Sequence, residues 1–90
     1  MDQKTLYSMI ASTGAIVLFF EDHPGFFGNW RTIVVKRHKT LEVISDHREG
    51  WIQFREILQN QSSVELRSMD SGIFDESREL SEIQLWLETQ

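Results

Sequence analysis

The sequence predicts a single domain of the α+β class, with the element order α-β-β-β-α-β-α and a mainly antiparallel four-stranded sheet packed by helices. Apolar residues make up 40% of the 90 residues, beside one proline and five glycines, which is the composition of a compact domain. Three segments repeat apolar residues at helical spacing, and four others carry the apolar runs of strands. Because 90 residues suffice for one modest core, we expect residues 1–90 to form a single globular domain.

The chain is predicted to begin with a helix over residues 4–11 and to continue with a strand over residues 14–20. Leu6, Met9 and Ile10 have the i, i+3, i+4 spacing of one helical face. Residues 14–20 are a continuous apolar run rich in β-branched and aromatic side chains, which is typical of a strand covered on both faces. We therefore expect this strand in the middle of the sheet.

Two further strands are predicted over residues 29–36 and 40–44. Only three residues separate them, so we expect the two strands to form an antiparallel hairpin. The connection contains neither glycine nor asparagine, which favours a longer or bulged loop over a two-residue turn.

A second helix is predicted over residues 46–59. Asp46 and Glu49 have the spacing of an acidic capping box, and four apolar residues follow at helical spacing. These residues are Trp51, Phe54, Ile57 and Leu58. Gly50 in the first turn is unfavourable for a helix. The alternative is therefore a hairpin that turns within residues 47–50 and leaves the next residues extended.

The last two elements are predicted to be a strand over residues 64–69 and a helix that begins near Ser77. Apolar and polar residues alternate approximately over the strand. Ser77 is a suitable N-cap, and Leu80, Ile83 and Leu87 follow on one helical face. With a helix between the third and fourth strands, we expect a right-handed crossover to join them.

The first five predicted elements resemble double-stranded RNA-binding domains in their order, α-β-β-β-α. The likeness is one of topology alone. Those domains carry a lysine-rich start to their second helix, where this chain has Asp46, His47, Arg48 and Glu49, and two further elements follow here. The function of those domains is therefore not carried over to this chain.

Charge is unevenly distributed along the chain. The formal net charge is −5, with +1 from residues 1–45 and −6 from residues 46–90. An acidic balance disfavours nucleic-acid binding, whose affinity comes chiefly from neutralising phosphates, and suits a partner with a basic surface. The absence of cysteine excludes disulfides, cysteine-ligated zinc and thiol catalysis. Because the sequence shows neither a secretory leader nor an apolar run of membrane-spanning length, we expect a cytoplasmic protein without a membrane partner.

The first candidate contact surface is the aromatic segment between the first two predicted strands, residues 21–30. It carries Phe26, Phe27 and Trp30. Aromatic side chains in a surface loop supply rigid contact area at protein interfaces. The alternative is that these side chains fold back over the sheet edge, because a domain this small needs its aromatic residues for burial.

The second candidate is the acidic stretch that leads into the last predicted helix. Its members are Asp75, Glu76, Glu79 and Glu82. An acidic surface of this kind speeds association with a basic protein partner. The alternative is that these carboxylates are the solvated face of an amphipathic helix.

A basic stripe ends at the predicted hairpin and is formed by Arg31, Lys36, Arg37 and Lys39. With Trp30 as a stacking platform, this stripe is the basis of the nucleic-acid-binding alternative. A solvated hairpin that discourages edge pairing is the simpler interpretation. A third interpretation pairs the stripe with the acidic last helix, within the monomer or across a homodimer.

No motif in the sequence indicates catalysis, a metal or a cofactor. The three histidines lack the i, i+4 spacing of a helical zinc site, and neither a G-x-S-x-G elbow nor a glycine-rich phosphate loop is present. The sequence therefore predicts a small, acidic, non-catalytic protein–protein interaction domain that binds a basic protein, in the manner of an immunity or antitoxin inhibitor. A small-ligand or enzymatic domain, with a pocket between the aromatic segment and the second predicted helix, is an alternative.

Overall fold

The computed structural model describes residues 2–23, 29–46, 50–59, 63–70 and 76–90. The described elements are α1 (Gln3–Ser12), β1 (Ile16–His23), β2 (Asn29–Lys36), β3 (Lys39–Asp46), β4 (Trp51–Ile57), β5 (Ser63–Asp70) and α2 (Glu76–Glu88). Neither helix is long and apolar enough to cross a membrane.

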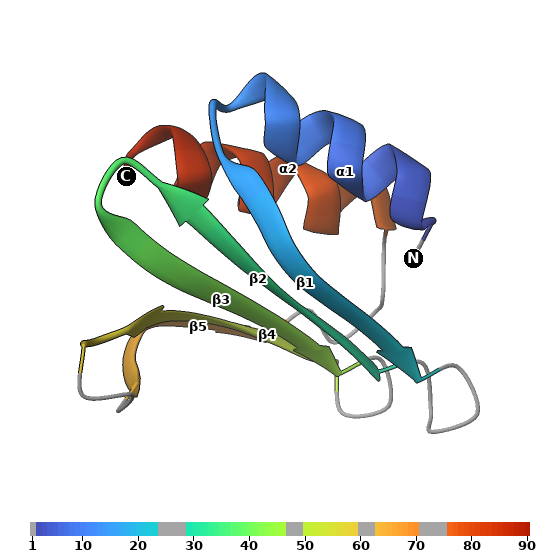
Figure 1. Ribbon diagram of the computed structural model, residues 1–90. Coiled ribbons are helices and arrows are strands. Elements are labelled where there is room, and N and C mark those ends of the chain that lie inside the picture. The colour runs from blue at the N-terminus through green and yellow to red at the C-terminus, as the bar shows by residue number, and fades with distance from the viewer. Residues whose placement is uncertain (1, 24–28, 47–49, 60–62, 71–75) are drawn as a thin grey trace.

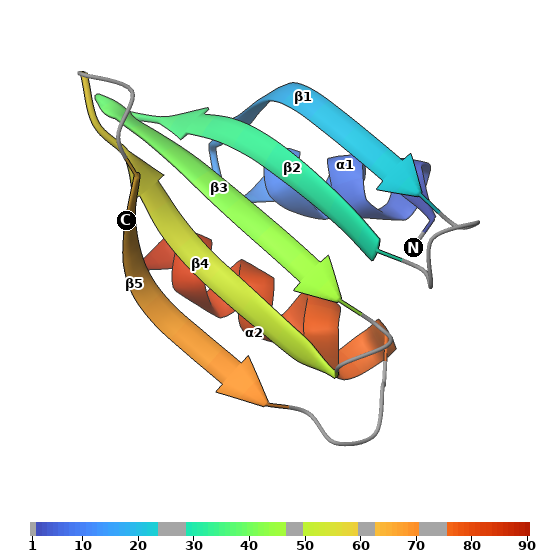
Figure 2. The same cartoon turned by 90° about the horizontal axis from the view of Figure 1, so that it is seen from below.

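The five strands form one antiparallel sheet in which neighbours in sequence are also neighbours in space, in the order β1-β2-β3-β4-β5. α1 and α2 contact each other and lie over the same face of this sheet (Figure 1). Seen from below, the sheet lies in front of both helices (Figure 2). The fold therefore has two layers, and none of the described elements lies over the second face of the sheet.

The hydrophobic core lies between the helices and the sheet. Its described side chains are Leu6, Ile10, Ala15, Trp30, Val34, Leu41, Val43, Ile52, Phe54, Ile83, Trp86 and Leu87. The rings of Phe54 on β4 and Trp86 on α2 have centroids 4.7 Å apart, so α2 packs directly on the C-terminal half of the sheet. α1 contributes Leu6 and Ile10, which confirms the helical face predicted for it.

The structure confirms the α+β class, both terminal helices and an antiparallel sheet, but the predicted helix over residues 46–59 is wrong. β4 lies there and pairs with β3, which is the hairpin alternative. Ile52 and Phe54 are buried at alternate positions, so the same apolar residues satisfy the period of a strand. Gly50 takes a φ of 76°, a left-handed conformation that a right-handed helix does not use.

Three further expectations change with this correction. The sheet has five strands instead of four, and a hairpin replaces the expected crossover after β3. The order α-β-β-β-α of double-stranded RNA-binding domains is also lost, because a strand follows β3. The topological resemblance therefore ends at the third strand.

The expectations for β1 and for the β2–β3 connection are also wrong. β1 is an edge strand, and its pairing with β2 shifts register between Val17 and Phe19 in a bulge that is typical of edges. The β2–β3 connection is a two-residue turn of Arg37 and His38. Arg37 makes this turn with a φ of 59°, in the left-handed region that usually requires glycine or asparagine.

Candidate protein-interaction surface

The face of the sheet opposite the helices is formed by alternate residues of each strand. Trp30 and Val34 of β2 are buried under the helices, so Arg31, Ile33 and Val35 face the other way. Cross-strand pairing extends this surface over the neighbouring strands. We call it the uncovered face, and its described members on the first four strands are Ile16, Phe19, Glu21, Asn29, Arg31, Ile33, Val35, Thr40, Glu42, Ile44, Asp46, Trp51, Gln53, Arg55 and Ile57.

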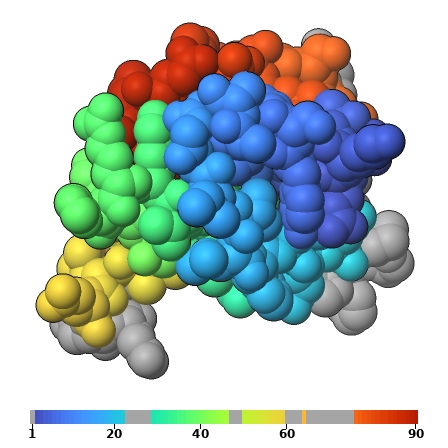
Figure 3. Space-filling model, turned by 45° about the horizontal axis from the view of Figure 1, so that its top comes forward, coloured from blue at the N-terminus to red at the C-terminus, as the bar shows by residue number. Residues whose placement is uncertain are grey.

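β1 gives the uncovered face an apolar edge. Ile16 pairs with Val35 and Phe19 pairs with Ile33, so four apolar side chains lie together across two strands. Ile16 is 66% exposed, Phe19 is 38% exposed, and Leu18, in the bulge between them, is 61% exposed. In the space-filling view the surface of β1 is open beside α1 (Figure 3). Single exposed apolar residues are ordinary, whereas a contiguous group of them marks a contact surface.

The centre of the uncovered face carries a carboxylate between two arginines. Arg31 Nη1 is 3.4 Å from Glu42 Oε2, and Arg55 Nε is 3.9 Å from Glu42 Oε1. Glu42 is only 7% exposed because its neighbours on β2 and β4 enclose it. The guanidinium carbon of Arg31 also lies 5.1 Å from the ring centroid of Phe19. Arg31 therefore joins the charged centre to the apolar edge.

Two residues predicted as contact residues, Trp30 and Glu79, are instead buried on the helix side of the sheet. Glu79 Oε1 accepts a hydrogen bond from Trp30 Nε1 at 3.2 Å, and Glu79 Oε2 accepts one from Ser45 Oγ at 2.7 Å. Burial away from water raises the pKa of Glu79 to about 7, against the opposing effect of the hydrogen bonds from Ser45 and Trp30. For Trp30 the structure agrees with the alternative in which the aromatic side chain is used for burial.

The sequence contains a signal for the burial of Glu79. Glu79 precedes Ile83 by four residues and Leu87 by eight, so it belongs to the apolar stripe of α2 and not to its solvated face. By residue type, Glu79 belongs with the neighbouring acids. By its position on the helix, it lies on the apolar face, away from them.

The other predicted contact residues are distributed as follows. Phe26, Phe27 and Asp75 lie outside the described residues. Glu76 is exposed at the start of α2, where its Oε1 accepts from the backbone N–H of Asp2 at 3.2 Å. Glu82 is half-buried on the same helix. The acidic surface that the structure describes on α2 is therefore narrower than the sequence suggests.

The basic stripe, formed by Arg31, Lys36, Arg37 and Lys39, does not stay together as one patch. Lys36 Nζ donates to the backbone oxygen of Leu87 at 2.6 Å, and Lys39 Nζ donates to Gln90 Oε1 at 3.4 Å. Both lysines therefore sit at the C-terminal end of α2, where the helix dipole favours cations. The two arginines lie elsewhere, one on the uncovered face and one exposed in the β2–β3 turn. Two of the four stripe residues therefore contact the end of the last helix within the monomer, through a backbone oxygen and a glutamine side chain.

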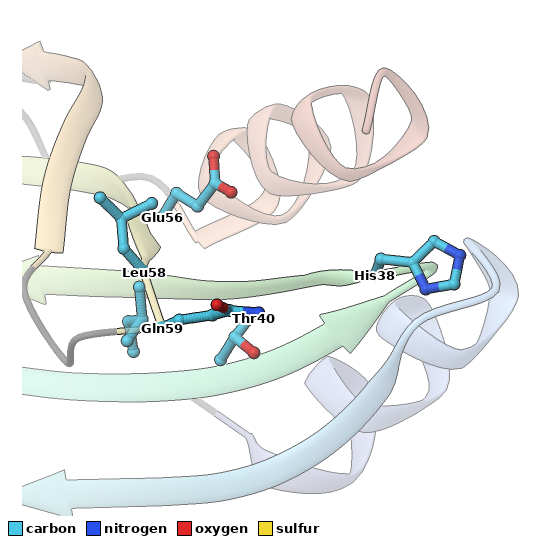
Figure 4. Close-up of a pocket in the computed structure, with 6 residues that line it drawn as sticks. His38, Thr40, Glu56, Leu58 and Gln59 are labelled. Carbon is cyan, nitrogen blue, oxygen red and sulfur yellow. The ribbon is translucent and has the colours of Figure 1, made fainter.

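A small cavity of about 210 Å³ lies near the β2–β3 turn. It is lined by His38, Thr40, Glu56, Ile57, Leu58 and Gln59. His38 lies at the turn and Glu56 lies toward α2, so the two titratable groups do not converge (Figure 4). The cavity is also smaller than the 300–1,000 Å³ typical of small-molecule sites, so it gives no support to a ligand-binding or enzymatic function. Two other hollows fall within that range, one of about 490 Å³ along the first turns of α1 and one of about 380 Å³ between α1 and the start of β1.

Two chemical alternatives concern other parts of the chain. The pocket predicted between the aromatic segment and the second predicted helix loses one of its walls, because β4 lies where that helix was expected. Residues 24–28 and 47–49 of the two segments lie outside the described residues. Among the residues that the structure describes, no group of three or more histidine, aspartate or glutamate side chains is placed to hold a metal ion.

No family model matches the sequence, and neither a curated protein nor a solved structure gives a significant match. The fold and the surface define the class of molecule as an α+β domain with one helical layer and an uncovered sheet face.

Proposed function

We propose that this chain is a non-catalytic protein-interaction domain that binds a protein partner through the uncovered face. The observation that carries the proposal is the group of exposed apolar side chains on β1, Ile16, Leu18 and Phe19, at the edge of that face. Removing apolar surface from water contributes about 25 cal/mol per Å², from which the entropic cost of association is subtracted. A partner that covers this edge therefore gains the main favourable term of protein association.

The charged centre of the uncovered face is suited to being covered. Glu42 already has Arg31 and Arg55 beside it, so a partner can exclude water from this centre without leaving a carboxylate unpaired. Arginine and aromatic side chains are also the residue types enriched at the centres of protein interfaces. Phe19 under the Arg31 guanidinium is such a pair.

An inhibitor of the immunity or antitoxin type, which binds a basic protein through α2, is the second candidate. Its support is the exposed acids Glu76 and Glu88 with Leu85, which is 58% exposed on the same helix. The burial of Glu79 removes one acid from that surface, and the uncovered face is the larger apolar surface. The nucleic-acid alternative has less support, because Lys36 and Lys39 contact the end of α2.

The experiment that tests the proposal compares two leucines of nearly equal exposure on opposite layers. Leu18 on β1 is 61% exposed and Leu85 on α2 is 58% exposed. The natural chain, Leu18→Lys and Leu85→Lys are immobilised and exposed to lysate of the source organism, after circular dichroism has shown that all three are folded. Mass spectrometry then quantifies the captured protein, whether it is another protein or a further copy of this chain.

The proposed function predicts one protein captured in stoichiometric amount by the natural chain and by Leu85→Lys, and lost with Leu18→Lys. Loss with Leu85→Lys alone would move the contact to α2 and favour the acidic inhibitor. If the three chains capture the same background and nothing in stoichiometric amount, the protein-interaction function is overturned.

A further inference from the structure

We infer that the partner of the uncovered face is a second copy of this chain, packed face to face about a two-fold axis. The inference rests on the proposed function, because it uses the same surface. Three observations favour a second copy as the partner: the area of the uncovered face, its charge and the position of the helices.

The area of the uncovered face is what a stable dimer needs. The first four strands, on which the described members of this face lie, have seven or eight residues each. At about 4.8 Å between strands and about 3.3 Å per residue, this part of the face covers roughly 500 Å². Two copies together therefore bury roughly 1,000 Å², the size above which a specific protein interface is expected.

The charge of the uncovered face favours contact with the same face of a second copy over contact with a basic protein. On the first four strands its described charged members are Glu21, Arg31, Glu42, Asp46 and Arg55, three acids and two arginines. These five side chains sum to −1, whereas the chain as a whole carries −5, so this part of the face is closer to neutral than the molecule. An interface about a two-fold axis joins the same patch on both copies, and a nearly neutral patch with both signs avoids like-charge repulsion there.

The position of the helices points the same way. α1 and α2 cover only the opposite face of the sheet, so face-to-face packing turns both helical layers outward (Figures 1 and 2). The exposed acids of α2, Glu76 and Glu88, then lie on the two outer surfaces of the dimer. The two sheets would pack at about 10 Å, the usual distance of a sandwich, with the apolar edge of β1 in contact.

The test is the mass of the protein in solution as its concentration is varied. Sedimentation equilibrium over about 1–200 μM is run on the natural chain, Leu18→Lys and the matched control Leu85→Lys. The expected result is a species of twice 10.6 kDa for the natural chain and for Leu85→Lys, and 10.6 kDa for Leu18→Lys. A charge at the apolar edge should raise the dissociation constant of the dimer at least tenfold. Ile16→Ser, a milder change on the same edge, should give an intermediate value if Leu18→Lys does not fold.

A natural chain that stays at 10.6 kDa throughout would overturn the inference. If capture from lysate nevertheless depends on Leu18, the proposed function stands and the partner is a different protein. A dimer that Leu85→Lys weakens, and that neither Leu18→Lys nor Ile16→Ser affects, would also overturn it, because α2 would then form the contact.

Discussion

The indole N–H of Trp30 donates to Glu79 Oε1 at 3.2 Å inside the core, on the helix side of the sheet. The second carboxyl oxygen of Glu79 accepts from Ser45, so one acidic side chain ties α2 to both β2 and β3. Burial makes the charged form of this carboxyl unfavourable, and its pKa is raised to about 7 from an ordinary value of 4.5. The packing of α2 on the sheet therefore depends on whether Glu79 carries a proton.

We predict that stability falls as the pH rises from about 5 to about 8. The folded protein holds the Glu79 proton more tightly than the unfolded chain does, so this stabilisation is complete below about pH 4.5 and is lost as the pH rises through about 7. The difference between 4.5 and about 7 corresponds to roughly 3 kcal/mol of unfolding free energy. Urea unfolding at a series of pH values measures it.

Two variants assign this pH dependence to Glu79. Glu79→Gln is neutral at every pH, so its unfolding free energy should vary far less over the same range. Glu88→Gln, which changes an exposed carboxylate at the other end of the same helix, should keep the slope of the natural chain. Equal slopes for the natural chain and Glu79→Gln would contradict the prediction.

The β2–β3 turn predicts a stabilising substitution. Arg37 has a φ of 59°, a conformation that costs a residue with a Cβ about 1 kcal/mol and costs glycine almost nothing. Arg37→Gly should therefore raise the unfolding free energy by about 0.5–1 kcal/mol, measured by thermal or urea unfolding. Among the described non-glycine residues Arg37 alone has a positive φ, so His38→Gly in the same turn should be neutral or destabilising. Equal effects at the two positions would argue against the described turn.

The charged centre of the uncovered face predicts a salt-dependent effect. Glu42→Gln removes the carboxylate charge between Arg31 and Arg55 while keeping its shape. The Arg31 side chain is 43% exposed, so solvent screens the interaction and the expected loss is only about 1 kcal/mol at low salt. That loss should shrink at high salt. Urea unfolding at two salt concentrations measures it, and Glu88→Gln, an exposed acid on α2, should change stability little in both. A loss for Glu42→Gln that does not change with salt would rule out the electrostatic explanation.

The local pattern of apolar residues predicted much of the fold. The prediction was wrong over residues 46–59, where the same apolar residues fit both the helical and the strand period. The helices at the two ends and the strands at 14–20, 29–36, 40–44 and 64–69 all correspond to described elements. Trp51, Phe54 and Ile57 fit helical spacing, yet β4 forms because β3 offers it a hydrogen-bonding partner. A partner strand is a property of the whole sheet, which no local window contains.

The candidate surface was harder to predict for a related reason. A strand lies at an edge or in the centre according to the order of the sheet, and the apolar run of β1 suits a buried strand as well as an exposed one. The expected helix over residues 46–59 also supplied a third helix to pack against the sheet. Without that helix, three apolar side chains of β1 that were expected in the core, Ile16, Leu18 and Phe19, lie at the surface.

The meander order of the sheet also determines the sequence in which the molecule can assemble. Each strand pairs with the one that precedes it, so the sheet can grow hairpin by hairpin as the chain leaves the ribosome. α2 follows the sheet in the chain, and it brings Ile83, Trp86 and Leu87 to a core that α1 and the sheet alone do not complete. The hydrogen bond between Asp2 and Glu76 joins residues 74 positions apart, so the two helices can meet only after all five strands have been synthesised. Until α2 has packed against it, the sheet exposes apolar residues on both faces. A chaperone would find the largest exposed apolar surface during this interval.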